Sequence, residues 1–107
     1  MNTALLLIDI QDSFRHRPYW DESELPAFLA RPNALIAGAQ ARGLPIVRIL
    51  HSDGPEQTDN PFGLASGQVR PLQGLAPYTA AAEFIKHRHS ALVGTGLAIW
   101  LHQQGMK

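Results

Sequence analysis

Two charged side chains close separate apolar segments of the chain. Asp9 follows the aliphatic run at residues 4–8, and Lys86 ends a second run that begins at residue 83. If both runs are strands of one parallel sheet, their carboxyl ends meet at one rim, where ligands bind in such sheets. A carboxylate there can act as a general base, and a buried ammonium beside it stabilises negative charge. Taken alone, both residues also have structural readings, since Asp often bonds nearby backbone and most Lys side chains are exposed.

Three aromatic residues lie shortly after Asp9 in the sequence. Phe14, Tyr19 and Trp20 are candidates for substrate binding, because ligand pockets are largely apolar and aromatic. They serve equally well as ordinary packing residues of a loop, and the sequence alone does not decide between the two interpretations.

Other residues offer weaker signals for a metal or a cofactor. His87 and His89 are two apart and share a face if they lie on a strand, but no third ligand has suitable spacing. Gly94 and Gly96 form only half of a dinucleotide fingerprint and are better explained as a tight turn. No phosphate-binding loop follows residues 4–8, which disfavours a flavodoxin-like nucleotide binder. We therefore expect no metal and no cofactor.

Strands and helices are predicted to alternate around these residues. Residues 4–8 form an unbroken aliphatic run, typical of a strand covered on both faces. A helical face of apolar side chains extends over residues 25–39, and Pro32 either starts a new segment or kinks this helix. Asp21 and Glu24 can form a capping box before it. The further predicted elements are a stop at Gly43, strands at residues 45–50 and 83–86, and a helix at residues 97–104 with Thr95 as its N-cap.

Composition and charge limit the class of protein. The chain has 107 residues, of which 45% are hydrophobic and 17% charged, so it is globular and large enough for one small domain. Nine basic and nine acidic residues balance, which argues against nucleic-acid binding. The N-terminal apolar run is too short for a membrane span and lacks a basic leader. We expect a cytoplasmic protein that acts on a small molecule and contacts neither membrane nor nucleic acid.

Three segments carry a resemblance to a known family. ALLLIDIQDSF at residues 4–14 resembles the opening strand and Asp-x-Gln-x-x-Phe signature of the isochorismatase-like cysteine hydrolases. KHRHSALVGTGLAIWL at residues 86–101 resembles the Lys-x-x-x-Ser-Ala block of that family, with Leu92 in place of the usual aromatic residue. ARGLPIVRILH at residues 41–51 fits its helix end and second strand. The resemblance extends over nearly the whole chain and is vaguest at residues 52–80, a long polar segment of the kind that often has a function.

The resemblance implies a catalytic triad of Asp, Lys and Cys. Asp9 and Lys86 match the first two positions, whereas the chain contains no cysteine and the third position would lie beyond Lys107. The family's cysteine hydrolases cleave C–N bonds of small amides or related substrates, and its true isochorismatases cleave a vinyl ether, which leaves an acid role for Asp9 open. The Asp-x-His metal site of some nicotinamidases is not matched by the sequence His51-Ser52-Asp53.

The resemblance also implies an α/β fold. We expect residues 1–107 to form a single three-layer α/β/α Rossmann-like domain, truncated at its C-terminal side, with a mostly parallel sheet in the strand order 3-2-1. The strand at residues 4–8 would then be an open edge, which invites pairing with another chain. We therefore expect a homo-oligomer. The chain alone would be inactive without its cysteine, and the alternative is a non-catalytic module that binds itself or a partner through this edge.

Overall fold

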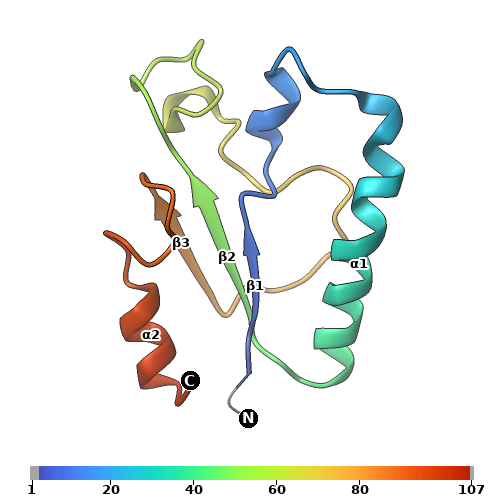
Figure 1. The fold of residues 1–107 in the computed structure, drawn as a ribbon, viewed down its shortest axis with the longest axis vertical. Coiled ribbons are helices and arrows are strands. Elements are labelled where there is room, and N and C mark those ends of the chain that lie inside the picture. Colours follow the sequence, from blue (N-terminus) through green and yellow to red (C-terminus); the bar gives the residue numbers. More distant parts are fainter. Residues whose placement is uncertain (1–2, 107) are drawn as a thin grey trace.

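A parallel sheet lies between two helices in the computed structural model, which describes residues 3–106 (Figure 1). Within these residues no helix has the length and apolar character needed to cross a membrane. The strands are β1 (Leu5–Ile8), β2 (Ile46–His51) and β3 (Ala82–Lys86). The α-helices are α1 (Leu25–Ala41) and α2 (Leu97–Gln103), and the short 3-10 helices are η1 (Asp12–His16), η2 (Glu22–Glu24) and η3 (Leu64–Ser66).

All three strands run in the same direction, with β2 in the centre. The order is β1-β2-β3, and Val47 of β2 is opposite Leu6 on one side and Ala82 on the other. The predicted strand order and the α/β/α layering are both confirmed. Parallel pairing places the carboxyl ends of the three strands at one rim, which lies at the top of Figure 1.

The core has two halves, one on each face of the sheet. Leu7, Ile36, Ala39 and Ile46 pack between the sheet and α1. Val47, Ile49 and Leu97 pack between the sheet and α2. Because β2 contributes side chains to both halves, its sequence IVRIL is almost continuously apolar, as expected for a strand that is covered on both faces.

Helix α1 is a single continuous helix and ends in a Schellman motif. Pro32 lies inside it and does not begin a new segment. At its end Gly43 adopts φ +67°, a left-handed conformation that glycine takes without steric cost. The N–H of Leu44 donates to the carbonyl of Ala39 at 2.9 Å, and the N–H of Gly43 donates to the carbonyl of Gln40 at 3.2 Å. The predicted stop at Gly43 is confirmed.

The predicted caps form differently from the sequence pattern. The Asp21 carboxylate accepts a hydrogen bond from the N–H of Ser23 at 3.0 Å, so it caps the short η2 turn, and Glu24 takes the N-cap position of α1 without a side-chain bond. Thr95 lies one residue before the N-cap of α2, where its hydroxyl accepts from the N–H of Leu97 at 3.2 Å. An inserted 3-10 turn and a one-residue offset explain the two differences.

The long segment between β2 and β3 is tied down close to the rim. The Asp12 carboxylate is buried and accepts hydrogen bonds from the Arg70 side chain at 2.7 Å and the Gln73 N–H at 2.9 Å. The Ser13 hydroxyl donates to the carbonyl of Gln68 at 3.0 Å. These bonds hold the segment against the residues that follow β1.

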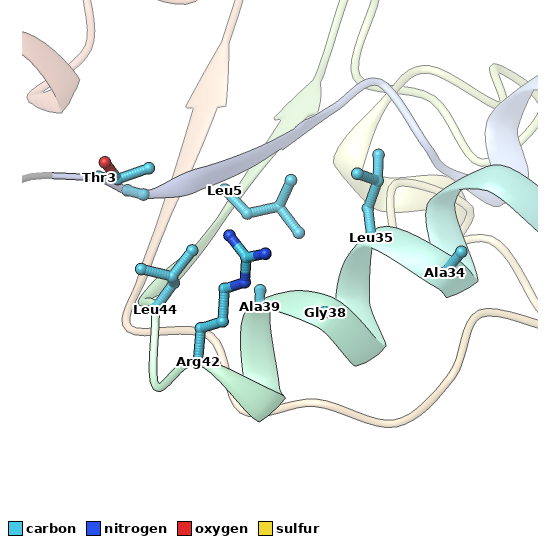
Figure 2. Close-up of a pocket in the computed structure, with 9 residues that line it drawn as sticks. Thr3, Leu5, Ala34, Leu35, Gly38, Ala39, Arg42 and Leu44 are labelled. Atoms are coloured by element: carbon cyan, nitrogen blue, oxygen red, sulfur yellow. The ribbon is translucent and has the colours of Figure 1, made fainter.

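One side of β1 has no strand beside it among the described residues. A groove of about 370 Å³ runs between β1 and the second half of α1 (Figure 2). Its walls are mostly apolar and include Leu5, Leu35, Gly38 and Leu44, and the Arg42 side chain extends from the end of the helix toward β1. Ile8, at the end of the same strand, is 40% exposed. The predicted open edge is present in this structure.

The two-sided core predicts a large penalty for truncating β2. Ile49→Ala removes a fully buried side chain from the centre of the sheet, so it should lower the free energy of unfolding by about 2–5 kcal/mol. Ile99→Ala is the matched control, since Ile99 is 66% exposed on α2, and it should change stability by about 0.5 kcal/mol or less. Urea denaturation of both variants measures the difference, and equal losses would contradict this description of the core.

Candidate functional site

Asp9 and Lys86 meet at the carboxyl rim of the sheet. Asp9 follows β1 directly, Lys86 is the last residue of β3, and the Lys86 Nζ lies 3.2 Å from the Asp9 Oδ1. Lys86 is only 3% exposed, whereas the Asp9 side chain is 36% exposed. The ammonium is therefore enclosed, and the carboxylate forms the accessible side of the pair.

The backbone at Asp9 has an unusual conformation. Its φ is +61°, the only positive value for a residue other than glycine among residues 3–106. Left-handed backbone costs roughly 1–2 kcal/mol for most L-residues and less for Asp or Asn. The surrounding structure holds it in place, for example through the Asp9 N–H, which donates to the carbonyl of Ile49 at 3.0 Å. This turn ends β1 at the point where the carboxylate reaches Lys86.

The Lys86 ammonium has two hydrogen-bond partners besides its ionic contact with Asp9. They are the His51 Nδ1 and the carbonyl oxygen of Arg88, both at 3.2 Å. The contact with Asp9 has the distance of an ion pair but not the geometry of a hydrogen bond, and the buried Asp9 Oδ1 has no hydrogen-bond partner within residues 3–106. Lys86 supplies positive charge to this oxygen, which retains the capacity to accept a proton.

Gln11 joins the ends of β1 and β2 beneath this pair. Its side chain is 1% exposed. The amide Nε2 donates to the carbonyl of His51 at 2.8 Å, and the amide Oε1 accepts from the N–H of His51 at 2.7 Å. A buried amide that satisfies both backbone groups of one residue fixes that residue firmly. The position of His51, and with it one partner of Lys86, therefore depends on Gln11.

The environment of His51 favours a neutral imidazole. Burial, followed by the positive charge of Lys86, holds the pKa of His51 below its usual value, while the charges of Asp9 and Asp53 act in the opposite direction. The His51 Nε2 lies 3.9 Å from the Asp53 Oδ2.

A cavity of about 300 Å³ opens over the charged pair. Charged and polar side chains line one part of it, and an aromatic cluster forms another part. Phe14 and Phe62 pack edge to face with their ring centroids 5.0 Å apart, and the Arg17 guanidinium lies 4.4 Å above the Phe62 ring. The complete lining is Asp9, Phe14, Arg17, Tyr19, His51, Asp53, Phe62, Lys86 and His89. This combination of apolar wall and converging polar groups is typical of small-molecule sites.

The three aromatic residues singled out in the sequence all lie near Asp9. Phe14 and Tyr19 line the cavity over the charged pair. Trp20 lies outside it and, with Phe14 and Tyr19, lines an adjoining apolar cavity of about 260 Å³ that also reaches Asp9. Tyr19 is 70% exposed, so it lies at the mouth of these cavities.

The two histidines after Lys86 do not form a pair. The chain leaves the β conformation after Lys86, so the alternation of a strand does not apply to His87 and His89. The His87 Nδ1 donates to the carbonyl of Ser52 at 3.1 Å, whereas His89 lines the cavity. Within the described part of the chain, no three His, Cys, Asp or Glu side chains are grouped as metal ligands.

Sequence reasoning did not assign a role to three residues of this region: Gln11, His51 and Phe62. Two of these roles could have been predicted from the sequence. Gln11 belongs to the same signature as Asp9, and His51 lies at the end of its strand, as Lys86 does. Phe62 lies in the long segment between β2 and β3, where no periodic pattern indicates which side chain turns inward, yet it is only 4% exposed.

Comparison with known proteins gives a match to one family model. The Isochorismatase domain model matches residues 3–107 of the chain. No curated protein matches the chain significantly.

Solved structures show the same fold. The structure of an isochorismatase family protein has a TM-score of 0.79 and 26% identity, and the match covers 98% of this chain and 59% of that one. A protein from Chromobacterium violaceum that is assigned to the isochorismatase family has a TM-score of 0.68 and 27% identity, over 95% of this chain and 51% of its own. N-carbamoylsarcosine amidase from Thermoplasma acidophilum, with 23% identity, shares the fold with a TM-score of 0.72 over 99% of this chain and 64% of its own.

The chain thus spans roughly half to three-fifths of the length of the first two proteins. The match to the domain model extends over nearly all of the sequence and includes both Asp9 and Lys86. This chain belongs to the isochorismatase family.

Proposed function

We propose that this chain is the Asp- and Lys-bearing part of a cysteine hydrolase that cleaves C–N bonds in small amides or related substrates. The observation that carries the proposal is the 3.2 Å contact between Lys86 and Asp9 at the rim of the sheet, below a cavity of about 300 Å³. Membership of the isochorismatase family, whose fold is shared by N-carbamoylsarcosine amidase, supports the reaction class.

The reaction requires a thiol, a base and a source of positive charge. Asp9 takes the proton of the thiol, and the sulfur forms a bond to the substrate carbonyl carbon. The C–N bond then breaks, and the proton passes from Asp9 to the leaving nitrogen. Water cleaves the resulting thioester and restores the thiol. Lys86 stabilises the negative charge that moves between sulfur and carboxylate, which is the main electrostatic requirement of both steps.

The nucleophile would come from residues outside this sequence. The chain has no cysteine, and the longest coverage of the three solved structures described above is 64% of the relative's length. We propose that the remaining part of a longer protein supplies the cysteine and completes the pocket, and that residues 1–107 alone are inactive. Phe14, Tyr19 and Trp20 would then contact the substrate through their positions beside Asp9.

Replacing Asp9 tests this mechanism in the form of the protein that carries the cysteine. Asp9→Asn introduces a side chain of the same shape that also adopts left-handed backbone, but it removes the base. The kcat/KM for amide hydrolysis should therefore fall about 100-fold or more. Lys86→Met should cause a similar loss. Asp59→Asn, at an exposed position that does not line the cavity, is the control and should retain activity. Amine release from a panel of small amides is the assay, and full activity in Asp9→Asn would exclude Asp9 as the base.

The same substitutions make a distinct prediction about stability. Asp9→Asn leaves a buried ammonium without its counter-ion, which is strongly destabilising, whereas removal of both charges leaves no unpaired ion. The double variant Asp9→Asn/Lys86→Met should therefore unfold at a higher temperature than Asp9→Asn. Thermal unfolding followed by circular dichroism measures the order, and a double variant that is less stable than the single one would show that Lys86 does not need the Asp9 charge.

The open edge of β1 supports a second proposal, that the 107-residue chain associates with itself. An unpaired strand with an apolar groove beside it is a template for pairing. Ile8→Lys places a charge at this edge and should shift the chain toward monomer, while Ile99→Lys, on the exposed face of α2, should not. Light scattering after size-exclusion chromatography gives the mass. A monomeric unaltered chain, or equal effects of the two variants, would contradict this proposal.

A further inference from the structure

Lys86 can donate to His51 only if His51 has one particular protonation state. An ammonium group has three donors and no acceptor, so the His51 Nδ1 at 3.2 Å must be unprotonated to receive its hydrogen bond. The proton of a neutral imidazole then lies on Nε2. That nitrogen is directed toward Asp53, whose Oδ2 is 3.9 Å away and favours a proton there. The two neighbours of the ring therefore favour the same tautomer from opposite sides.

Hydrogen bonds to the backbone of His51 and a ring contact also restrict its position. Gln11 binds both backbone groups of His51, at 2.8 and 2.7 Å. The Phe62 ring packs against the imidazole with a centroid distance of 6.2 Å. Gln11, which follows β1, thus fixes the backbone of His51, whereas Phe62, from the segment after β2, contacts its ring.

We propose that His51 is a positioning residue: its neutral imidazole, protonated on Nε2, accepts a hydrogen bond from Lys86 and holds the ammonium beside Asp9. The contact can be tested whether or not the protein is a hydrolase, whereas its role in catalysis rests on the proposed function. Residues Gln11, His51, Lys86 and Asp9 then form one connected arrangement across all three strands.

The arrangement has a defined response to acid. A proton on Nδ1 would remove the acceptor and place two positive groups 3.2 Å apart, so the hydrogen bond with Lys86 would break. The titratable groups that face the ring are Asp9 after β1, Asp53 after β2, and Lys86 and His89 at and after the end of β3. Because the folded pKa of His51 is lowered, the unfolded chain binds a proton first, and stability falls as the pH drops below about 6.5 toward the folded pKa.

Nitrogen NMR of the histidine side chains tests the contact directly in the unaltered protein. The expected spectrum at neutral pH shows a pyridine-like Nδ1 and a pyrrole-like Nε2 for His51. If the chain assembles into oligomers, solid-state NMR gives the same information. A protonated Nδ1, or a mixture of tautomers such as a free imidazole shows, would overturn the proposal.

Lys86→Met provides the second measurement on the same signal. Loss of the cation should raise the pKa of His51, because Asp9 and Asp53 remain, and should weaken its preference for the Nε2 proton. His102, on α2 and outside the cavity lining, is the internal control, and its side-chain nitrogen signals should not differ between the two proteins. An unchanged His51 pKa and tautomer in this variant would show that the two side chains do not interact.

Substitution of His51 tests its role in the cysteine-bearing form. In His51→Asn, the amide oxygen can take the place of Nδ1 as the acceptor for Lys86. His51→Leu has a similar size but no acceptor. The kcat of His51→Leu should fall about 10- to 100-fold, the size of one hydrogen bond to a charged group, and His51→Asn should recover at least tenfold of that loss. In the plot of kcat/KM against pH, the ionisation of His51 should also be missing from the acid limb of His51→Asn. Equal kcat values in the two variants, or an unchanged acid limb, would remove His51 from the mechanism.

The two proposals fail separately. If the tautomer and its dependence on Lys86 are found but the unaltered protein hydrolyses no amide, the hydrolase proposal is wrong and the contact stands. If hydrolysis occurs while His51 carries its proton on Nδ1, the positioning role is wrong and the hydrolase proposal stands.

Discussion

The constraint on which this rim depends is the burial of a positive charge. Lys86 is almost fully enclosed, and an ionised amine in such a place is very costly unless its charge and its N–H groups are matched. Asp9 supplies the opposite charge, and His51 and the Arg88 carbonyl supply hydrogen-bond acceptors. These groups come from the ends of three different strands, so the sheet must be in register before the ammonium can be buried. The charge at the end of β3 thereby links the correct packing of the fold to the formation of the site.

Parallel topology explains why the polar groups gather at one end. Every strand ends at the same rim, where Gln11 fills the gap between β1 and β2 with an amide that bonds to backbone on the neighbouring strand. The opposite end of the sheet has a tight connection, the Schellman turn between α1 and β2. The segment after β2 crosses the rim and adds Phe62 to the cavity wall. The core therefore fixes positions, while the chain beyond the strand ends provides the chemical groups.

Much of this arrangement could be predicted from the sequence, for identifiable reasons. Continuous aliphatic runs indicated buried parallel strands, and the order of strand, helix and strand indicated the topology. The resemblance to the isochorismatase-like family singled out Asp9 and Lys86, and the convergence of parallel strand ends explains why the two residues meet. The inward position of Phe62 could not be predicted, because it depends on contacts such as those of Asp12 with Arg70 and Gln73, which are distant in sequence. The capping pattern at Asp21 was misleading for a local reason, since an additional 3-10 turn separates it from α1. The partnership of His51 with Lys86 likewise requires side-chain geometry that spacing alone does not contain.

The positive φ of Asp9 has a consequence for engineering and evolution of this fold. Glycine is the residue that fits a left-handed position with least strain, so the backbone conformation taken alone would favour Gly at position 9. Such a replacement would relax the backbone but remove the carboxylate that neutralises Lys86. The buried ammonium without its counter-ion would cost more stability than the relaxed backbone gains. Libraries selected only for heat resistance should therefore avoid position 9, or pair its change with loss of the lysine charge. An acidic residue in a conformation that suits glycine therefore accepts backbone strain at this site in return for neutralising a buried charge.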